Sequence, residues 1–129
     1  MALTIAAAST QAMGAALATN IGAAATIEIR SGAKPATPET AASGTLLVTI
    51  AISGSFTSTG GVLTAADPAA AAPAASGTAG YFRLKQSGGT AVLDGTVGTS
   101  AADLILGSTT ITTGVNVDLG VPTITVPVA

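Results

Sequence analysis

The densest group of chemically capable side chains in this sequence lies in GYFRLKQSGGTAVLDG, the segment from Gly80 to Gly95. It holds two of the three aromatic residues of the chain and three of its ten charged residues, Arg83, Lys85 and Asp94. An active site would use Arg83 and Asp94 as a charged pair beside a nucleophile or a base. The alternative is a well-specified β-hairpin of a structural protein.

The hairpin hypothesis gives the segment a defined register. A type I′ turn needs a positive φ at both central positions, and Gly88-Gly89 supplies it. A slip of one residue would place a leucine opposite a charged side chain, so the pattern specifies the pairing. We expect Arg83 and Asp94 to form an exposed ion pair worth at most about 1 kcal/mol. The expected partners are Ser87 with Thr90, Leu84 with Leu93, Arg83 with Asp94, and Phe82 with Gly95, whose backbone the ring covers.

Catalysis has little support in the residue inventory. The chain contains neither His nor Cys, so the commonest general base and all thiolate chemistry are missing. A serine nucleophile would need Lys34 or Lys85 as its base, and neither lies in an S-x-x-K pattern. The six carboxylates are scattered, without the oxygen spacing of a calcium loop. We therefore expect no enzyme, with no catalytic residue, no cofactor and no metal site.

Composition also argues against several partners. Four Lys and Arg cannot form the basic stripe that nucleic acid requires. Three aromatic residues offer no platform for sugars, so a carbohydrate-binding module is the weaker alternative. The N-terminus lacks the positive charge of a signal peptide and no segment is apolar enough to span a bilayer, so we expect cytoplasmic synthesis and no membrane partner. With 8% charged residues and a net charge of −2, the surface suits a subunit packed against copies of itself or a larger partner.

One short helix is expected near the N-terminus, over about residues 10–21. Ser9 or Thr10 can cap its start, and Gly22 is a plausible stop. An apolar stripe recurs at i, i+4 and i+8, formed by Met13, Leu17 and Ile21.

The rest of the chain has the pattern of short strands. Thr26–Arg30 alternates apolar and charged residues, which is typical of a half-buried strand, and residues 33–44 follow as a loop. Thr, Val and Ile at this spacing indicate a mainly antiparallel β-sandwich or jelly-roll-like fold. We expect one domain over residues 1–129, with an N-terminal arm at 1–8 and an Ala/Pro-rich exposed loop at 67–77. The remaining expected strands cover residues 45–52, 62–64, 103–106, 109–112, 115–119 and 123–126, and residues 54–61 are expected to form a turn.

Three segments carry a resemblance: residues 27–50, IEIRSGAKPATPETAASGTLLVTI; residues 77–106, GTAGYFRLKQSGGTAVLDGTVGTSAADLIL; and residues 110–127, TITTGVNVDLGVPTITVP. They resemble small virion proteins encoded among the structural genes of tailed bacteriophages, most of all capsid cement, or decoration, proteins with a sandwich or jelly-roll body. The resemblance covers about residues 11–127 and is most distinctive over residues 77–98.

This resemblance implies a function outside catalysis. A cement protein binds the major capsid protein on the outside of the virion, contacts other copies of itself as a dimer or higher assembly, and stabilises the shell. A minor tail or head-fibre protein is the alternative that the same resemblance implies.

The two ends of the chain are the candidate interface. Leu3 and Ile5 precede the expected helix, and Val126, Pro127 and Val128 follow the last expected turn. Leaving each of the four aliphatic side chains in water would forgo roughly 1.5 kcal/mol or more. Either the ends complete the sheet of their own chain, or at least one packs against a neighbouring subunit or the shell. Pro127 favours an edge or an end, because proline cannot donate to a β-ladder.

Overall fold

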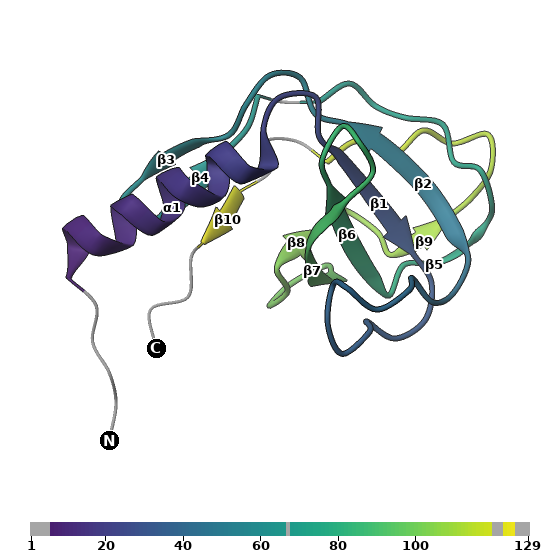
Figure 1. Ribbon diagram of the computed structural model, residues 1–129. Helices are drawn as coiled ribbons and strands as arrows, with labels where there is room; N and C mark the ends of the chain where they lie inside the picture. The colour runs from purple at the N-terminus through teal and green to yellow at the C-terminus, as the bar shows by residue number, and fades with distance from the viewer. Residues whose placement is uncertain (1–5, 67, 120–122, 126–129) are drawn as a thin grey trace.

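The computed structural model describes residues 6–66, 68–119 and 123–125 (Figure 1). It confirms a mainly β protein with one helix at the N-terminus. The sandwich or jelly-roll arrangement stays a prediction. The elements are α1 (Ala7–Ile21), β1 (Thr26–Arg30), β2 (Leu46–Ala51), β3 (Thr57–Thr59), β4 (Val62–Thr64), β5 (Gly77–Thr78), β6 (Tyr81–Lys85), β7 (Ala91–Gly98), β8 (Leu104–Ile105), β9 (Thr110–Ile111) and β10 (Thr123–Thr125).

The strands form three sheets in two parts of the molecule. A five-stranded sheet, in the order β2-β1-β6-β7-β8, is antiparallel except for the parallel pair β7–β8. Together with the two-stranded sheet β5–β9 it makes up what we call the body. A three-stranded sheet, β10-β4-β3, packs against α1. We call this part the lobe, comprising residues 6–22, 55–64 and 123–125, and it projects to the left of the body in Figure 1.

The helix packs on the lobe sheet through small side chains rather than through the expected apolar stripe. Thr10, Gly14, Ala18 and Ile21 are buried, while Met13 is 43% exposed, so the expected stripe is wrong at Met13. Helix and sheet approach so closely that a Cβ at Gly14 would lie 2.3 Å from Ser58 Oγ. A large side chain has no room on that face and is turned outward.

Of the two predicted ends of the helix, only the C-terminal end is confirmed. The expected cap at Ser9 or Thr10 is wrong, because α1 begins at Ala7 and Ala6 makes no side-chain cap. The expected stop at Gly22 is confirmed. Its φ is +72°, and its backbone N–H donates to the carbonyl of Ala18.

The hairpin β6–β7 has the expected register but a different turn. Arg83 lies opposite Asp94 and Leu84 opposite Leu93, as predicted. The expected type I′ turn is wrong, since Gly89 alone of the two glycines has a positive φ. Gly89 N–H donates to Gln86 O and Gln86 N–H to Thr90 O, which makes a three-residue loop and overturns the pairing of Ser87 with Thr90.

A β-bulge restores the predicted register beyond this longer loop. Lys85 pairs with Ala91, and the next pair is Leu84 with Leu93, so Val92 is an extra residue on β7. Compared with the predicted hairpin, the loop includes one more residue of the first strand, Ser87, and the bulge leaves one residue of β7, Val92, without a partner. The two changes cancel, which is why the facing leucines are right although the turn is not.

Several segments differ from the prediction in burial or in secondary structure. β1 has the predicted bounds, but it is buried on both faces rather than half-buried. Residues 54–61 contain β3, which pairs with β4 and was not expected. Residues 115–119 contribute only an isolated bridge between Val117 and Ala71. That bridge, with the buried Pro68, holds part of the Ala/Pro-rich segment against the body, so the segment is less exposed than expected.

The contact between Phe82 and Gly95 yields a direct test of the hairpin. A Cβ at Gly95 would lie 2.4 Å from the Phe82 ring. Gly95→Ala should therefore lower the free energy of unfolding by about 1–3 kcal/mol, measured by urea denaturation. Gly88→Ala is the matched control, because its Cβ would meet nothing within 4 Å. Equal stability of the two variants would contradict the close packing of the ring on Gly95.

Candidate functional site

A row of charged side chains crosses the five-stranded sheet. Glu28 on β1 lies opposite Arg83 on β6, and Arg83 lies opposite Asp94 on β7. Arg30 and Lys85 are two residues further along their strands and therefore point to the same side. We call these five residues the charged row. It joins the charges of the hairpin, which the sequence set beside one another, to two charges more than fifty residues earlier in the chain.

Arg83 and Asp94 form a buried bidentate ion pair. The guanidinium donates from Nε to Oδ1 at 2.7 Å and from Nη2 to Oδ2 at 2.9 Å. The two side chains are only 4% and 2% exposed, so the expectation of an exposed pair is wrong. The hairpin lies inside a larger sheet, between β1 and β8, rather than at its surface. The hydrogen bonds to Asp94 raise the pKa of Arg83 against the opposing effect of burial, which keeps the guanidinium charged.

Glu28 is shared by the two remaining cations of the row. Its Oε1 accepts hydrogen bonds from Arg30 Nε at 3.2 Å and Nη2 at 3.1 Å, and its Oε2 accepts one from Lys85 Nζ at 3.1 Å. The Glu28 side chain is 12% exposed, which explains why β1 is buried on both faces. Both carboxylates of the row are therefore held by cations, so neither is placed as a general acid or base.

The other polar side chains of this region hold loops in place. Tyr81 Oη donates to the carbonyl of Ser43 at 2.8 Å and accepts from its N–H at 3.0 Å, which pins the connection between β1 and β2. Asp103 Oδ2 accepts from the backbone N–H of Thr96 at 2.9 Å, which ties the connection after β7 to that strand. Across the residues that the structure describes, no three Asp or Glu side chains gather as metal ligands. The arrangement can hold the sheet together; the absence of enzyme activity stays a prediction.

The buried pair can be tested by removing one partner or both. Arg83→Met leaves Asp94 as a buried unpaired charge and should lower the free energy of unfolding by about 3–5 kcal/mol. The double variant Arg83→Met/Asp94→Leu should recover most of that loss, because no unpaired charge remains. Lys34→Met, at an exposed lysine, is the control and should change stability by less than about 0.5 kcal/mol. Chemical denaturation measures all three. A double variant no more stable than the single one would show that the pair is not the source of the loss.

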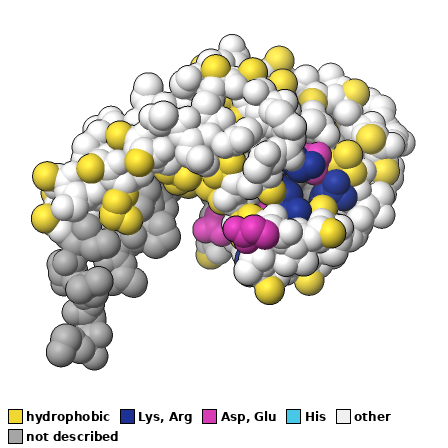
Figure 2. All heavy atoms as spheres, viewed as in Figure 1, with side chains coloured by type: hydrophobic (Ala, Val, Ile, Leu, Met, Phe, Trp, Pro, Cys, Tyr) yellow, Lys and Arg dark blue, Asp and Glu magenta, His cyan; other side chains and the backbone are white. Residues whose placement is uncertain are grey.

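The lobe differs from the body in charge, because it contains no charged side chain among its described residues. The charges of the chain begin at Glu28, and none occurs in residues 40–66 or 119–129. Met13 and Val62 are large apolar residues exposed on this part, at 43% and 36%. Figure 2 shows apolar and neutral atoms over the lobe, whereas the dark blue and magenta atoms gather on the body. The lobe is therefore a surface that can be covered by a partner without desolvating a charge.

α1 and the hairpin formed by β3 and β4 are held together by specific contacts at the far end of the lobe. The Gln11 side chain donates from Nε2 to Ser58 O at 2.9 Å and accepts the backbone N–H of Gly60. Gly61 lies against Thr10, where a Cβ would come 2.3 Å from the threonine methyl group. These contacts fix the turn between β3 and β4 to the first turns of α1, so the far end of the lobe is a defined surface.

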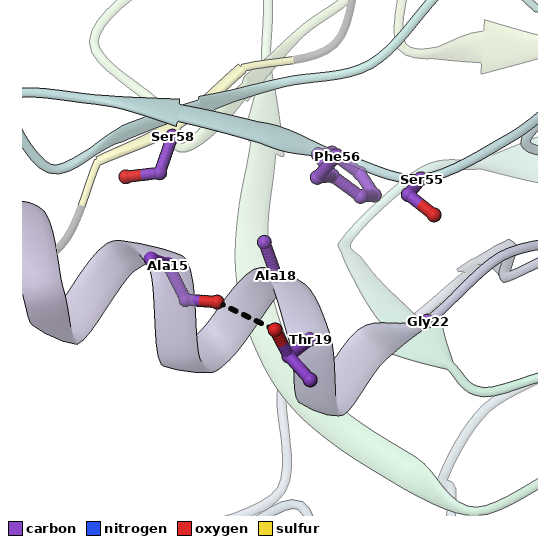
Figure 3. A pocket seen from close by; sticks show the side chains of 7 residues that line it. All are labelled: Ala15, Ala18, Thr19, Gly22, Ser55, Phe56 and Ser58. Carbon is purple, nitrogen blue, oxygen red and sulfur yellow. Dashed lines mark hydrogen bonds between the residues drawn. The ribbon is translucent and has the colours of Figure 1, made fainter.

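A pocket of about 410 Å³ opens between α1 and the segment that leads into β3, with Ser55, Phe56 and Ser58 on that side (Figure 3). Its walls are neutral, and the Thr19 hydroxyl is used within the helix, donating to Ala15 O at 3.0 Å. Ser58 Oγ is buried without a hydrogen-bond partner among the described residues. The oxygen lies beside Gly14, where the backbones are too close for a larger residue. The lining includes the aromatic ring of Phe56 but no charged group that would select a substrate.

The residues predicted as an interface, Leu3, Ile5, Val126, Pro127 and Val128, lie outside the described residues. The structure does place the neighbouring residues of both ends. Ala6 precedes α1 at the far end of the lobe, and Thr125 pairs with Val62 beside the same turn. Both ends of the described chain therefore belong to the uncharged lobe. Residues 123–125 complete the lobe sheet, in agreement with the alternative that the C-terminal segment serves its own chain.

Sequence reasoning missed the segregation of charge, although the signal was present. It lies in the intervals that contain no charged residue, 1–27, 40–66 and 119–129, because parts of all three, residues 6–22, 55–64 and 123–125, form the lobe. Knowing which of these intervals become neighbours required the pairing of β4 with β10, which are about sixty residues apart.

Comparison with known proteins adds no relative. No family model, no curated protein and no solved structure matches this chain. Among the described residues, the helix is too short and too weakly apolar to cross a membrane. A function therefore has to be inferred from the charged row and from the uncharged lobe.

Proposed function

We propose that this chain is a structural virion protein that binds the outside of a tailed-phage capsid, contacts the major capsid protein, and stabilises the shell. The resemblance in sequence motivates the proposal, and the uncharged lobe is the observation that carries it. A surface that stays in water throughout its life gains solubility from charge. A lobe without any charge in its described residues, which includes both ends of the described chain, is better suited to be covered by a partner.

The physical requirements of a cement protein agree with this surface. Each copy is held at one of many symmetry-related sites, so a modest contact per copy is enough to stabilise the whole shell. Covering the lobe removes apolar side chains and small backbone-rich segments from water without burying an unpaired charge. The charged row, in contrast, is already neutralised inside the body and has no part in the contact.

The proposal predicts that one new charge on the lobe weakens attachment to particles. Met13→Glu places a carboxylate on the exposed side of α1 and should reduce the number of bound copies about tenfold, equivalent to about 1.4 kcal/mol. The measurement mixes the purified variant with phage particles that lack the protein, pellets the particles, and quantifies the bound chain. Particle resistance to heating, followed by release of DNA, should fall in parallel.

Val115→Glu is the matched control. Val115 is also a large exposed apolar residue, at 63%, but it lies on the body. This variant should bind as the unmodified chain does, and thermal unfolding of both free variants should remain close to that of the unmodified chain. Equal loss of binding in the two variants, or no loss in either, would contradict docking through the lobe.

A further inference from the structure

A second hollow of the molecule lies where the lobe meets the body. It has a volume of about 670 Å³ and is lined mainly by apolar side chains from both parts. Leu17 of α1 and Ile124 of β10 come from the lobe, and Phe82, Leu93 and Ile105 come from the body sheet. Ile105 is 48% exposed, so this apolar surface is incompletely covered. We call this hollow the junction groove.

Two strand edges border the junction groove. β8 is the last strand of the five-stranded sheet and β10 is the first strand of the lobe sheet, so within the described residues each has a strand neighbour on one side only. Ile105 of β8 and Thr123 and Ile124 of β10 all line the groove. A strand edge carries backbone donors and acceptors that an added extended segment can pair with. The groove thus offers a mainly apolar lining, which also includes Asp94 and Asp103 of the body, together with backbone partners at its borders.

We propose that the junction groove receives residues 2–5, Ala-Leu-Thr-Ile, from a second copy of this chain. In an extended segment Leu3 and Ile5 point to one side and Thr4 to the other, so two aliphatic side chains enter the groove together. The segment has no charge and no proline, so it can pair along its whole length. Residues 126–129 fit less well, because Pro127 lacks a backbone donor.

The reach of the chain favours the groove of a second copy over the groove of the same copy. Leu17 follows Ala6 by eleven residues of helix, which corresponds to roughly 16 Å along the axis. Leu3 precedes Ala6 by three residues, which span at most about 11 Å when fully extended. Since α1 starts at the end of the lobe away from the body, a segment entering the groove of its own copy would have to fold back along α1, and even a fully extended path from Ala6 would end short of Leu17 (Figure 1). A neighbouring copy has no such restriction.

Engineered cysteines test this contact without ambiguity, because the chain contains no cysteine of its own. One preparation carries Leu3→Cys and the other carries Ile105→Cys. After mixing and mild oxidation, a disulfide between the two different chains should form, because the two positions come within disulfide distance in the proposed contact. Non-reducing electrophoresis and mass spectrometry identify the linked pair.

Thr49→Cys replaces Ile105→Cys in the control mixture. Thr49 is exposed on β2, at the other edge of the same sheet. The yield of the mixed disulfide should be about tenfold lower than with Ile105→Cys, because Thr49 is far from the groove. Equal yields would overturn the proposal. So would a double variant, Leu3→Cys/Ile105→Cys, that closes only within one chain.

A second measurement keeps the proposal testable without any cross-link. Leu3→Asp puts a charge into the groove, whereas Thr4→Asp puts the same charge on the opposite side of the same segment. Sedimentation equilibrium should show the dissociation constant of the self-assembled form rising about tenfold or more for Leu3→Asp and much less for Thr4→Asp. An unmodified chain that is monomeric at millimolar concentration would overturn the inference. No particle enters either assay, so failure here leaves the proposed binding to the capsid untouched.

Discussion

Arg83 and Asp94 lie buried in the middle of the five-stranded sheet, and a buried charge is tolerated only when its partner is in place. Shifting β7 by one residue would separate them and leave two unpaired charges inside the protein. On the other side of β6, shifting β1 by one residue would likewise separate Glu28 from Lys85. The charged row therefore acts on both neighbours of β6 at once. We infer that it specifies register across β1, β6 and β7 more than it adds stability, since a buried ion pair often contributes little net free energy.

The charged row also shapes the rest of the surface. It uses five of the ten charges of the chain, and the other charges that the structure describes are on the body. The lobe is consequently built from Ala, Gly, Ser, Thr and a few aliphatic residues. Such residues allow helix and sheet to approach closely, as Gly14 and Ser58 do, but they leave the outer surface without charge. Close packing and an uncharged exterior are thus two results of one composition.

The sequence predicts those features that depend on neighbouring residues. β1 and the register from Tyr81 to Leu84 were predictable because alternation and cross-strand pairing are local properties. The turn was not, because a two-residue loop and a three-residue loop with a bulge produce the same facing leucines. The exposure of Met13 was not predictable either, since it depends on how closely β3 approaches α1. Burial of Arg83 and Asp94 likewise required the position of the hairpin within the larger sheet.

The two proposed contacts use different parts of the molecule and can coexist. In the proposed arrangement the outer side of α1 would face the shell, whereas the junction groove and residues 2–5 would join one copy to the next. A segment entering a groove is a contact between two unlike surfaces, so it repeats from copy to copy in one direction. Such a contact closes into a ring only when the rotation between neighbours divides a full turn; otherwise it grows as an open chain. A shell whose binding sites surround rotation axes imposes that rotation, so attachment to the shell would select the closed ring and restrain open growth in solution.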